Sequence, residues 1–137
     1  MKLSTMYPNF KPAAEFWLEG KNYSLLSDDS KNISFMIPLA SHKKGFDYYE
    51  LDNINGGVVF SLVTMLGFKT IKKSSSQIIS NDLSYDDWRY KIEEIIGSHL
   101  RSEEYQALKN GYAKTSSGCL GMLAFLFISF FLIFKNF

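Results

Sequence analysis

The chain has 137 residues, with 15 lysines and arginines against 14 aspartates and glutamates, and one cysteine. This near-neutral balance lacks the basic excess with which nucleic-acid-binding proteins neutralise phosphates, so we expect no nucleic-acid partner. A single cysteine excludes an intramolecular disulfide and a cysteine-rich zinc site, and the sequence contains no nucleotide-binding loop. We therefore expect neither a metal nor another cofactor.

The first half of the chain is rich in short apolar segments separated by turn residues. Glu15–Leu18 and Tyr23–Leu26 flank a glycine-containing connection of hairpin length, which predicts two paired strands. Asn32–Ile37 alternates apolar and polar residues before Pro38, where a strand should end, and Phe46–Leu51 supplies a fourth strand. These segments predict an N-terminal antiparallel sheet.

A second apolar run, Val58–Phe68, follows the glycine-rich break Asn53–Gly57. Val59, Leu62 and Leu66 fall on one face of a helix, whereas the β-branched residues of the run suit a strand equally well. A second membrane span is another alternative, although the run would cover only about two thirds of the hydrocarbon core of a bilayer. Among these alternatives we expect a core helix.

The second half is predicted to be mainly helical. Lys72–Ser76 is expected to form a polar turn and Gln77–Ser80 a short strand. Ser84 then precedes two aspartates and a stripe of apolar residues at helical spacing that ends at His99, which predicts a capped helix. A shorter second helix follows, and Gly111–Ser117 is expected to form a flexible neck.

The C-terminal segment is the most informative part of the sequence. No residue from Thr115 to Phe134 is charged, and a helix over this stretch would reach about 30 Å, the thickness of the hydrocarbon core. The run predicts a single transmembrane helix, with a helix buried in a soluble domain or oligomer as the alternative. The residues of the predicted anchor are Gly118, Cys119, Leu120, Gly121, Met122, Leu123, Ala124, Phe125, Leu126, Phe127, Ile128, Ser129, Phe130, Phe131, Leu132, Ile133 and Phe134.

The charges that flank this run predict its orientation. Three basic residues precede the anchor closely and only Lys135 follows it, so the positive-inside rule places the preceding domain in the cytoplasm. We expect residues 1–114 to form a cytosolic α+β domain, with N-terminal strands and C-terminal helices, and residues 115–137 to form the anchor and a short tail. This layout resembles that of a tail-anchored protein, and the Lys-, Asn-, Ser- and Ile-rich composition favours a bacterial inner membrane.

Residues near the membrane are predicted to contact lipid or a second copy of the chain. The lysines expected to contact anionic headgroups are Lys69, Lys72, Lys73 and Lys114, with the pair Lys43 and Lys44 as a second small cluster. Small residues at the spacing of Ser117, Gly121 and Ala124 allow helices to approach closely. A homodimer through the anchor is therefore a hypothesis.

The residues that could carry catalysis are few. Neither histidine has a metal-ligand partner at helical spacing, and His99 lies on an apolar stripe, where a packed structural histidine is expected. An enzymatic alternative would combine His42 with nearby acids, namely Asp47, Glu50 and Asp52. Because no nucleophile turn of the Gly-x-Ser-x-Gly kind occurs, we expect no catalytic residue.

Together these features predict a membrane-tethered binding or accessory module, such as an immunity or regulatory protein. Its expected partners are the lipid bilayer and a protein at the membrane, because a tether raises the effective concentration of anything else held there. A two-span toxin-like or pore-like protein and a membrane-tethered enzyme are the alternatives.

Overall fold

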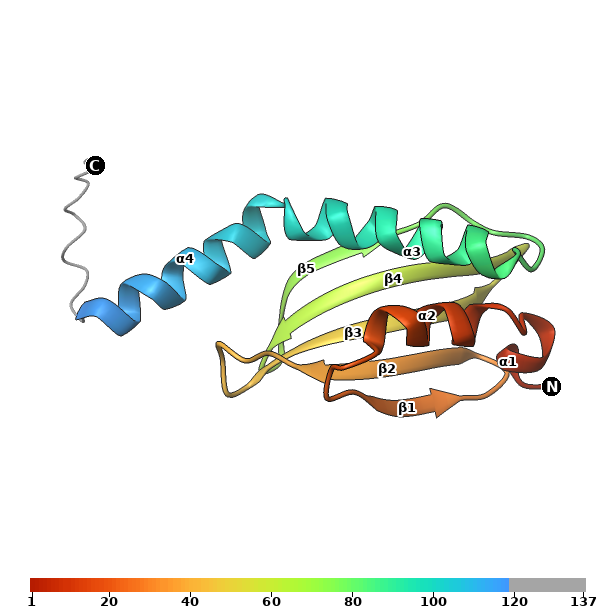
Figure 1. Ribbon diagram of the computed structural model, residues 1–137, viewed down its shortest axis with the longest axis horizontal. Coiled ribbons are helices and arrows are strands. Elements are labelled where there is room, and N and C mark those ends of the chain that lie inside the picture. The colour runs from red at the N-terminus through yellow and green to blue at the C-terminus, as the bar shows by residue number, and fades with distance from the viewer. Residues whose placement is uncertain (119–137) are drawn as a thin grey trace. The chain divides into compact units, whose positions relative to one another are not determined.

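The computed structural model has an α+β fold in which one five-stranded antiparallel sheet is preceded and followed by helices (Figure 1). It describes the backbone of residues 1–118 and the side chains of residues 1–110. The chain divides into two units, Met1–Ser102 and Glu103–Phe137. The predicted α+β class is therefore confirmed.

The sheet is a simple meander in which each strand pairs antiparallel with the next along the chain. Its strands are β1 (Ser24–Asp28), β2 (Asn32–Pro38), β3 (Gly45–Ile54), β4 (Gly57–Leu66) and β5 (Lys69–Ser75). The helices are α1 (Leu3–Met6), α2 (Phe10–Leu18), α3 (Tyr85–Leu100) and α4 (Glu103–Gly118), of which α4 belongs to the second unit.

Helices α1, α2 and α3 lie on one face of the sheet and form the core with it (Figure 1). Because side chains alternate between the faces of a strand, every second residue of β2, β3 and β4 points into this core. Phe10 of α2 contacts both α3 and β4. The centroid of its ring lies 5.1 Å from that of Trp88 on α3 and 5.8 Å from that of Phe60 on β4. Aromatic contacts thus join both helices to the sheet.

Helix α2 replaces the strand that Glu15–Leu18 was expected to form, so that prediction is wrong. The buried residues Phe10, Ala13, Ala14 and Leu18 recur at helical spacing, and this stripe begins before the segment that was expected to be a strand. Pro12 lies in the first turn of α2, where a backbone N–H has no partner within the helix and proline is tolerated.

The run Val58–Phe68 forms strand β4 and its turn, so the expected core helix is wrong. Strand β4 pairs with β3 on one side and β5 on the other, which explains its almost continuous burial. Val58, Phe60 and Leu62 point into the helical core, and Ser61 and Val63 point to the opposite face but are also buried. A strand buried on both faces loses the alternating pattern that normally identifies it.

The segments around β5 also differ from expectation. Lys72–Ser75, expected in a turn, lies in β5, and Gln77–Ser80 contributes only the isolated bridge between Ile79 and Val58. The predicted helix after Ser84 is confirmed as α3, with the Ser84 hydroxyl accepting a hydrogen bond from the Asp87 backbone N–H. Helix α4 continues to Gly118, so the segment expected to be a flexible neck is helical.

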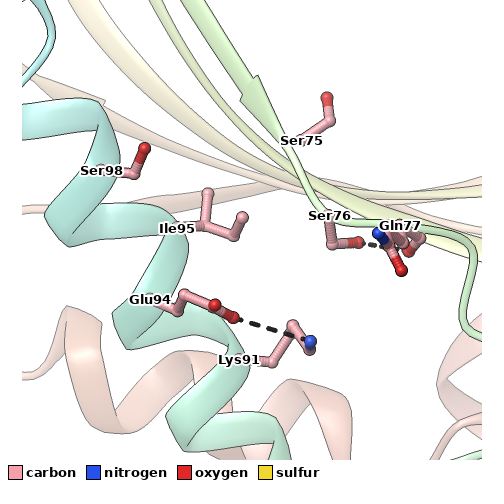
Figure 2. Close-up of a pocket in the computed structure, with 7 residues that line it drawn as sticks. All are labelled: Ser75, Ser76, Gln77, Lys91, Glu94, Ile95 and Ser98. Atoms are coloured by element: carbon pink, nitrogen blue, oxygen red, sulfur yellow. Dashed lines mark hydrogen bonds and ion pairs between the residues drawn. The ribbon is translucent and has the colours of Figure 1, made fainter.

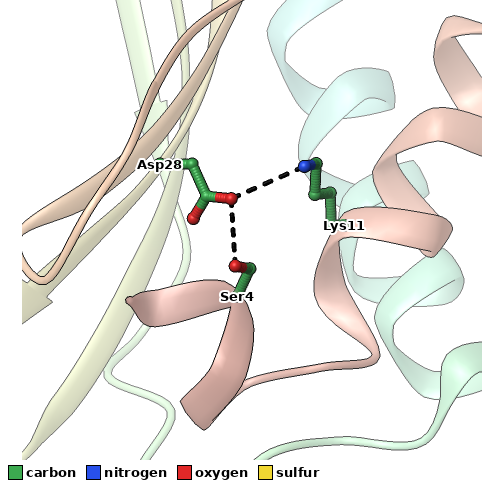
Figure 3. A network of polar contacts seen from close by, with 3 residues as sticks. All are labelled: Ser4, Lys11 and Asp28. Carbon is green, nitrogen blue, oxygen red and sulfur yellow. Dashed lines mark hydrogen bonds and ion pairs between the residues drawn. The ribbon is translucent and has the colours of Figure 1, made fainter. Parts of the chain in front are cut away.

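A polar contact fixes the N-terminal helices to the end of β1 (Figure 3). The Ser4 hydroxyl of α1 donates to Asp28 Oδ2 at 2.9 Å, and Lys11 Nζ of α2 lies 3.5 Å from the same oxygen. Leu3 N donates to the Asp29 carbonyl at 2.8 Å. The Asp28 side chain is only 12% exposed, and these bonds offset part of the cost of burying its carboxylate, because both reach Oδ2 whereas Oδ1 is buried without a hydrogen-bond partner among the described residues.

The predicted anchor from Cys119 onward lies outside the described residues, as do the side chains of Lys114 and Ser117. Within residues 1–118, no helix has the length and apolar character needed to span a bilayer.

Candidate functional site

A buried chain of polar side chains links the sheet to α3. Thr64 Oγ1 of β4 lies 2.5 Å from Asp47 Oδ1 of β3 and 2.7 Å from His99 Nε2 of α3. On the other side of the imidazole ring, Nδ1 lies 2.8 Å from the hydroxyl of Ser74 on β5. Cross-strand register produces this arrangement, because Asp47 pairs directly with Thr64 and both point toward the helices.

The hydrogen bonds assign a tautomer to His99. A threonine hydroxyl has one proton, and that of Thr64 is donated to the Asp47 carboxylate. The Thr64 oxygen therefore accepts its second bond, which requires His99 Nε2 to carry a proton. In the neutral ring, Nδ1 then accepts from the Ser74 hydroxyl. The four residues make an ordered relay from a carboxylate to a serine.

This relay contains the residue types of a catalytic arrangement, but its central groups are not accessible to a substrate. Both Thr64 and His99 are 0% exposed, so a substrate cannot reach the hydroxyl or the imidazole in this conformation. The geometry suits a structural role in which α3 is held on the sheet by polar bonds as well as apolar contacts. His99 is thus the packed histidine expected from its stripe, and both of its ring nitrogens have hydrogen-bond partners.

The enzymatic alternative required His42 beside one of three acids, and the structure places these acids on different faces of the sheet. His42 lies in the loop between β2 and β3, with Nδ1 2.9 Å from the hydroxyl of its neighbour Ser41. Asp47 points toward the helices, whereas Glu50 and Asp52 belong to the opposite face by strand alternation. The pairing that does occur, Asp47 with His99 through Thr64, was not foreseen.

Burial raises the pKa of the Asp47 carboxyl above its ordinary value of 3.8, although the bond from Thr64 and the charge of Lys21 oppose the shift. A carboxyl whose pKa is higher in the folded state binds protons more readily there than in the unfolded chain. It therefore favours folding most at a pH below its ordinary pKa, and this contribution is lost as the pH rises through the folded-state pKa.

We expect the change in the free energy of unfolding caused by Asp47→Asn to be more favourable to the folded state at pH 7 than at pH 4. The amide carries no charge to bury, and its oxygen can still accept the Thr64 hydroxyl proton. The measurement is urea unfolding of wild type and variant in detergent micelles from pH 4 to pH 8. A difference between the two proteins that stays constant over this range would contradict the assigned cause.

The face of the sheet that points away from the helices carries a polar row. Ser34, Glu50 and Ser61 lie directly opposite one another on β2, β3 and β4. Burial and then the charge of Asp52 raise the pKa of Glu50, against the charge of Lys73 and the hydrogen bond of Ser34. The next cross-strand row is apolar and consists of Met36, Tyr48 and Val63.

A polar cavity of about 380 Å³ lies between α3 and the end of β5 (Figure 2). Its lining residues are Ser75, Ser76, Gln77, Lys91, Glu94, Ile95 and Ser98. The two charged side chains on its helical wall pair with each other, with Lys91 Nζ 3.6 Å from Glu94 Oε1. Because these charges neutralise each other and the remaining lining is mostly hydroxyl and amide groups, the cavity has no concentrated charge for an ionic ligand.

Exposed lysines gather at one end of the sheet, which we call the basic end. It consists of the α2–β1 turn, the β2–β3 loop and the β4–β5 turn, which the alternating strand directions bring together (Figure 1). The Gly67 backbone N–H donates to the Lys44 carbonyl at 2.8 Å, so the loop and the second turn are in contact. The exposed lysines of the basic end are Lys21, Lys43, Lys44 and Lys69.

The predicted headgroup-binding lysines are therefore divided by the structure. Lys69 begins β5 at the basic end, whereas Lys72 is partly buried and Lys73 lies farther along the same strand. Strand β5 is an edge strand, and lysines on an edge hinder pairing with other sheets. That role accounts for Lys73 without any lipid, but it does not account for the loop residues Lys43 and Lys44.

One residue at this end was not identified from the sequence. Phe68 follows Gly67 in the two-residue turn between the paired residues Leu66 and Lys69. Gly67 has a φ of 63°, which the tight hairpin turn requires, and the Phe68 side chain is 104% exposed. The sequence signal was present, since a Gly-X pair between two strands predicts a hairpin tip, but the run was interpreted as a helix that included Phe68.

Among the described residues, no group of three or more His, Cys, Asp and Glu side chains is arranged to hold a metal ion. Comparisons of the chain with protein-family models, with curated proteins and with solved structures find no match.

Proposed function

We propose that the protein is a single-pass membrane protein whose α+β domain, residues 1–114, is a non-enzymatic binding or accessory module in the cytoplasm. The observation that carries this proposal is the uncharged run from Thr115 to Phe134, which follows a unit with its own aromatic and aliphatic core. An uncharged stretch of this length fits the thickness of a bilayer. The anchor would be residues 118–134, in a bacterial inner membrane.

Two features of the domain favour binding over catalysis. Thr64 and His99 at the centre of the relay are closed to solvent, which suits stability more than turnover. On the face of the sheet away from the helices, the partly exposed side chains of Met36 and Tyr48 lie beside the carboxyl of Glu50, with the buried Val63 next to Tyr48. Methionine and aromatic residues are enriched in protein interfaces, which supports recognition of another protein by this face. A partner held in the same membrane would meet this face at a high effective concentration.

The anchor is tested by alkaline extraction of membranes that contain the full chain. We expect the full chain to remain with the membranes, and a chain that ends at Lys114 to be released. A Leu126→Arg variant should weaken insertion, because a central arginine costs about 2.5–3.5 kcal/mol on insertion scales. Release of the unmodified full chain would contradict the anchor.

The binding face is tested in the same membranes with a photoreactive amino acid at position 48 and a control at position 90. Tyr90 of α3 is 68% exposed but lies on the helical side of the domain. We expect an adduct of defined mass from position 48 and none from position 90. Equal labelling at both positions would contradict a specific binding face.

A further inference from the structure

We propose that the basic end docks on anionic lipid, with Phe68 inserted between the headgroups and Lys43, Lys44 and Lys69 around it. This inference rests on the proposed membrane anchor and adds the orientation of the domain. An apolar tip surrounded by cationic side chains is the arrangement with which proteins bind the surface of an anionic bilayer.

Phe68 contributes nothing to the core that would explain an aromatic residue at this position. Its side chain is 104% exposed at the tip of a hairpin, and the turn itself requires only Gly67. A single projecting ring is a poor centre for a protein interface, which buries its aromatic residues within a wider patch. The same ring suits the interfacial layer of a bilayer, where apolar groups insert one at a time.

The lysines around Phe68 are held together by the backbone. Lys69 is adjacent in sequence, and the Lys44 carbonyl accepts the hydrogen bond from Gly67 N. Gly45, next to Lys44, pairs with Leu66 at the end of β4. The β2–β3 loop and the β4–β5 turn therefore present their charges as one surface. Glu19 is an exposed acid at the end of α2, and the lysines outnumber it.

The separation of charge along the sheet determines which end of the first unit faces an anionic membrane surface. Residues 1–102 contain equal numbers of basic and acidic residues, and six of the 12 acids lie at the end opposite to Phe68, together with Lys2, Lys11 and Lys31. The acidic residues of that end are Asp28, Asp29, Asp52, Asp82, Asp86 and Asp87. An anionic surface attracts one end of the unit and repels the other.

The path of the chain agrees with this direction. His99 of α3 contacts Thr64, which lies close to the basic end of β4, so α3 finishes toward that end (Figure 1). The first unit therefore ends, at Ser102, on the side that carries Phe68.

The experiment uses the full chain with Cys119→Ser, reconstituted in vesicles of phosphatidylcholine with or without phosphatidylglycerol. An environment-sensitive dye is placed on Phe68→Cys or, as the matched control, on Ile78→Cys. Ile78 is also an exposed apolar residue, at 56%, but it lies at the acidic end. We expect nitroxide-labelled lipid to quench the dye at position 68 in anionic vesicles, with much weaker quenching in neutral vesicles and none at position 78.

The contribution of charge is tested by two matched double variants. Lys43→Gln/Lys44→Gln should lower the ratio of docked to undocked domain about thirtyfold, whereas Lys2→Gln/Lys31→Gln, at the acidic end, should leave it unchanged. Absence of quenching at position 68, or equal quenching at positions 68 and 78, would overturn the proposal. So would equal effects of the two double variants.

Failure of the anchor remains distinguishable from failure of docking. If alkaline extraction releases the full chain, the labelled protein is added to the outside of preformed anionic vesicles. Quenching at position 68 alone would then still support docking, and its absence would overturn it. Phe68→Ala should leave the free energy of unfolding in urea unchanged. A loss of docking caused by a substitution at position 68 would therefore not come from a folding defect.

Discussion

Replacing Trp88 with alanine is expected to lower the free energy of unfolding by about 3–5 kcal/mol. Trp88 is 0% exposed, and its ring meets that of Phe10 edge-on at 5.1 Å. Its Nε1 donates to Asp82 Oδ1 at 2.8 Å, so the truncation removes a buried hydrogen bond as well as apolar contacts. Since domains of this size are stable by about 5–15 kcal/mol, the variant should lose much of its cooperative unfolding.

Tyr90→Ala is the matched control for Trp88→Ala. Tyr90 lies two positions along the same helix and is 68% exposed, so its truncation should change the free energy of unfolding by less than about 0.5 kcal/mol. Urea unfolding followed by circular dichroism compares the two variants without depending on the tryptophan that is removed. Similar losses in both variants would contradict the position of α3 on the sheet.

Thr64→Val is expected to lower the free energy of unfolding by about 1–3 kcal/mol. Valine has nearly the shape of threonine, so the change removes little more than the hydroxyl group. That hydroxyl bonds both Asp47 at 2.5 Å and His99 at 2.7 Å, and its loss leaves two polar groups without this partner in a closed site.

The control for this substitution is Thr70→Val. Thr70 is exposed on β5, where its hydroxyl contacts Met65 Sδ, and we expect a change of less than about 0.5 kcal/mol. Combining Thr64→Val with Asp47→Ala, which removes the acceptor of the Thr64 hydroxyl, in a double-mutant cycle would measure the coupling between the two residues. Equal effects of Thr64→Val and Thr70→Val, or additive effects in the cycle, would contradict the relay.

The parts of the fold that the sequence predicted are those with one buried face. The stripe of α3 and the alternation in β2 each reflect such an element, and the cap at Ser84 marks a helix start through ordinary hydrogen-bond chemistry. Strand β4 was misassigned because burial of both faces removed its period. Helix α2 was missed because the strand prediction rested on Glu15–Leu18 and the glycine-containing connection after it, whereas the buried stripe of the helix begins at Phe10.

The candidate sites were harder to predict, because they depend on register and strand direction. His99 and Asp47 are far apart in the sequence, and only the pairing of Asp47 with Thr64 brings them into one relay. The basic end likewise combines residues from separate connections, and only the meander places Lys44 beside Gly67. Composition indicated lysine clusters, but it could not indicate that Phe68 projects among them.

The central claim is that a domain with its own core is held at a membrane by the C-terminal run. The most direct measurement is the urea unfolding, after alkaline extraction, of the chain that ends at Lys114. We predict that this chain is released from membranes, remains monomeric in solution and unfolds in one cooperative transition. Aggregation of this chain, or continued association with membranes, would contradict the claim and would show that the C-terminal run completes the fold or that other segments lie in lipid.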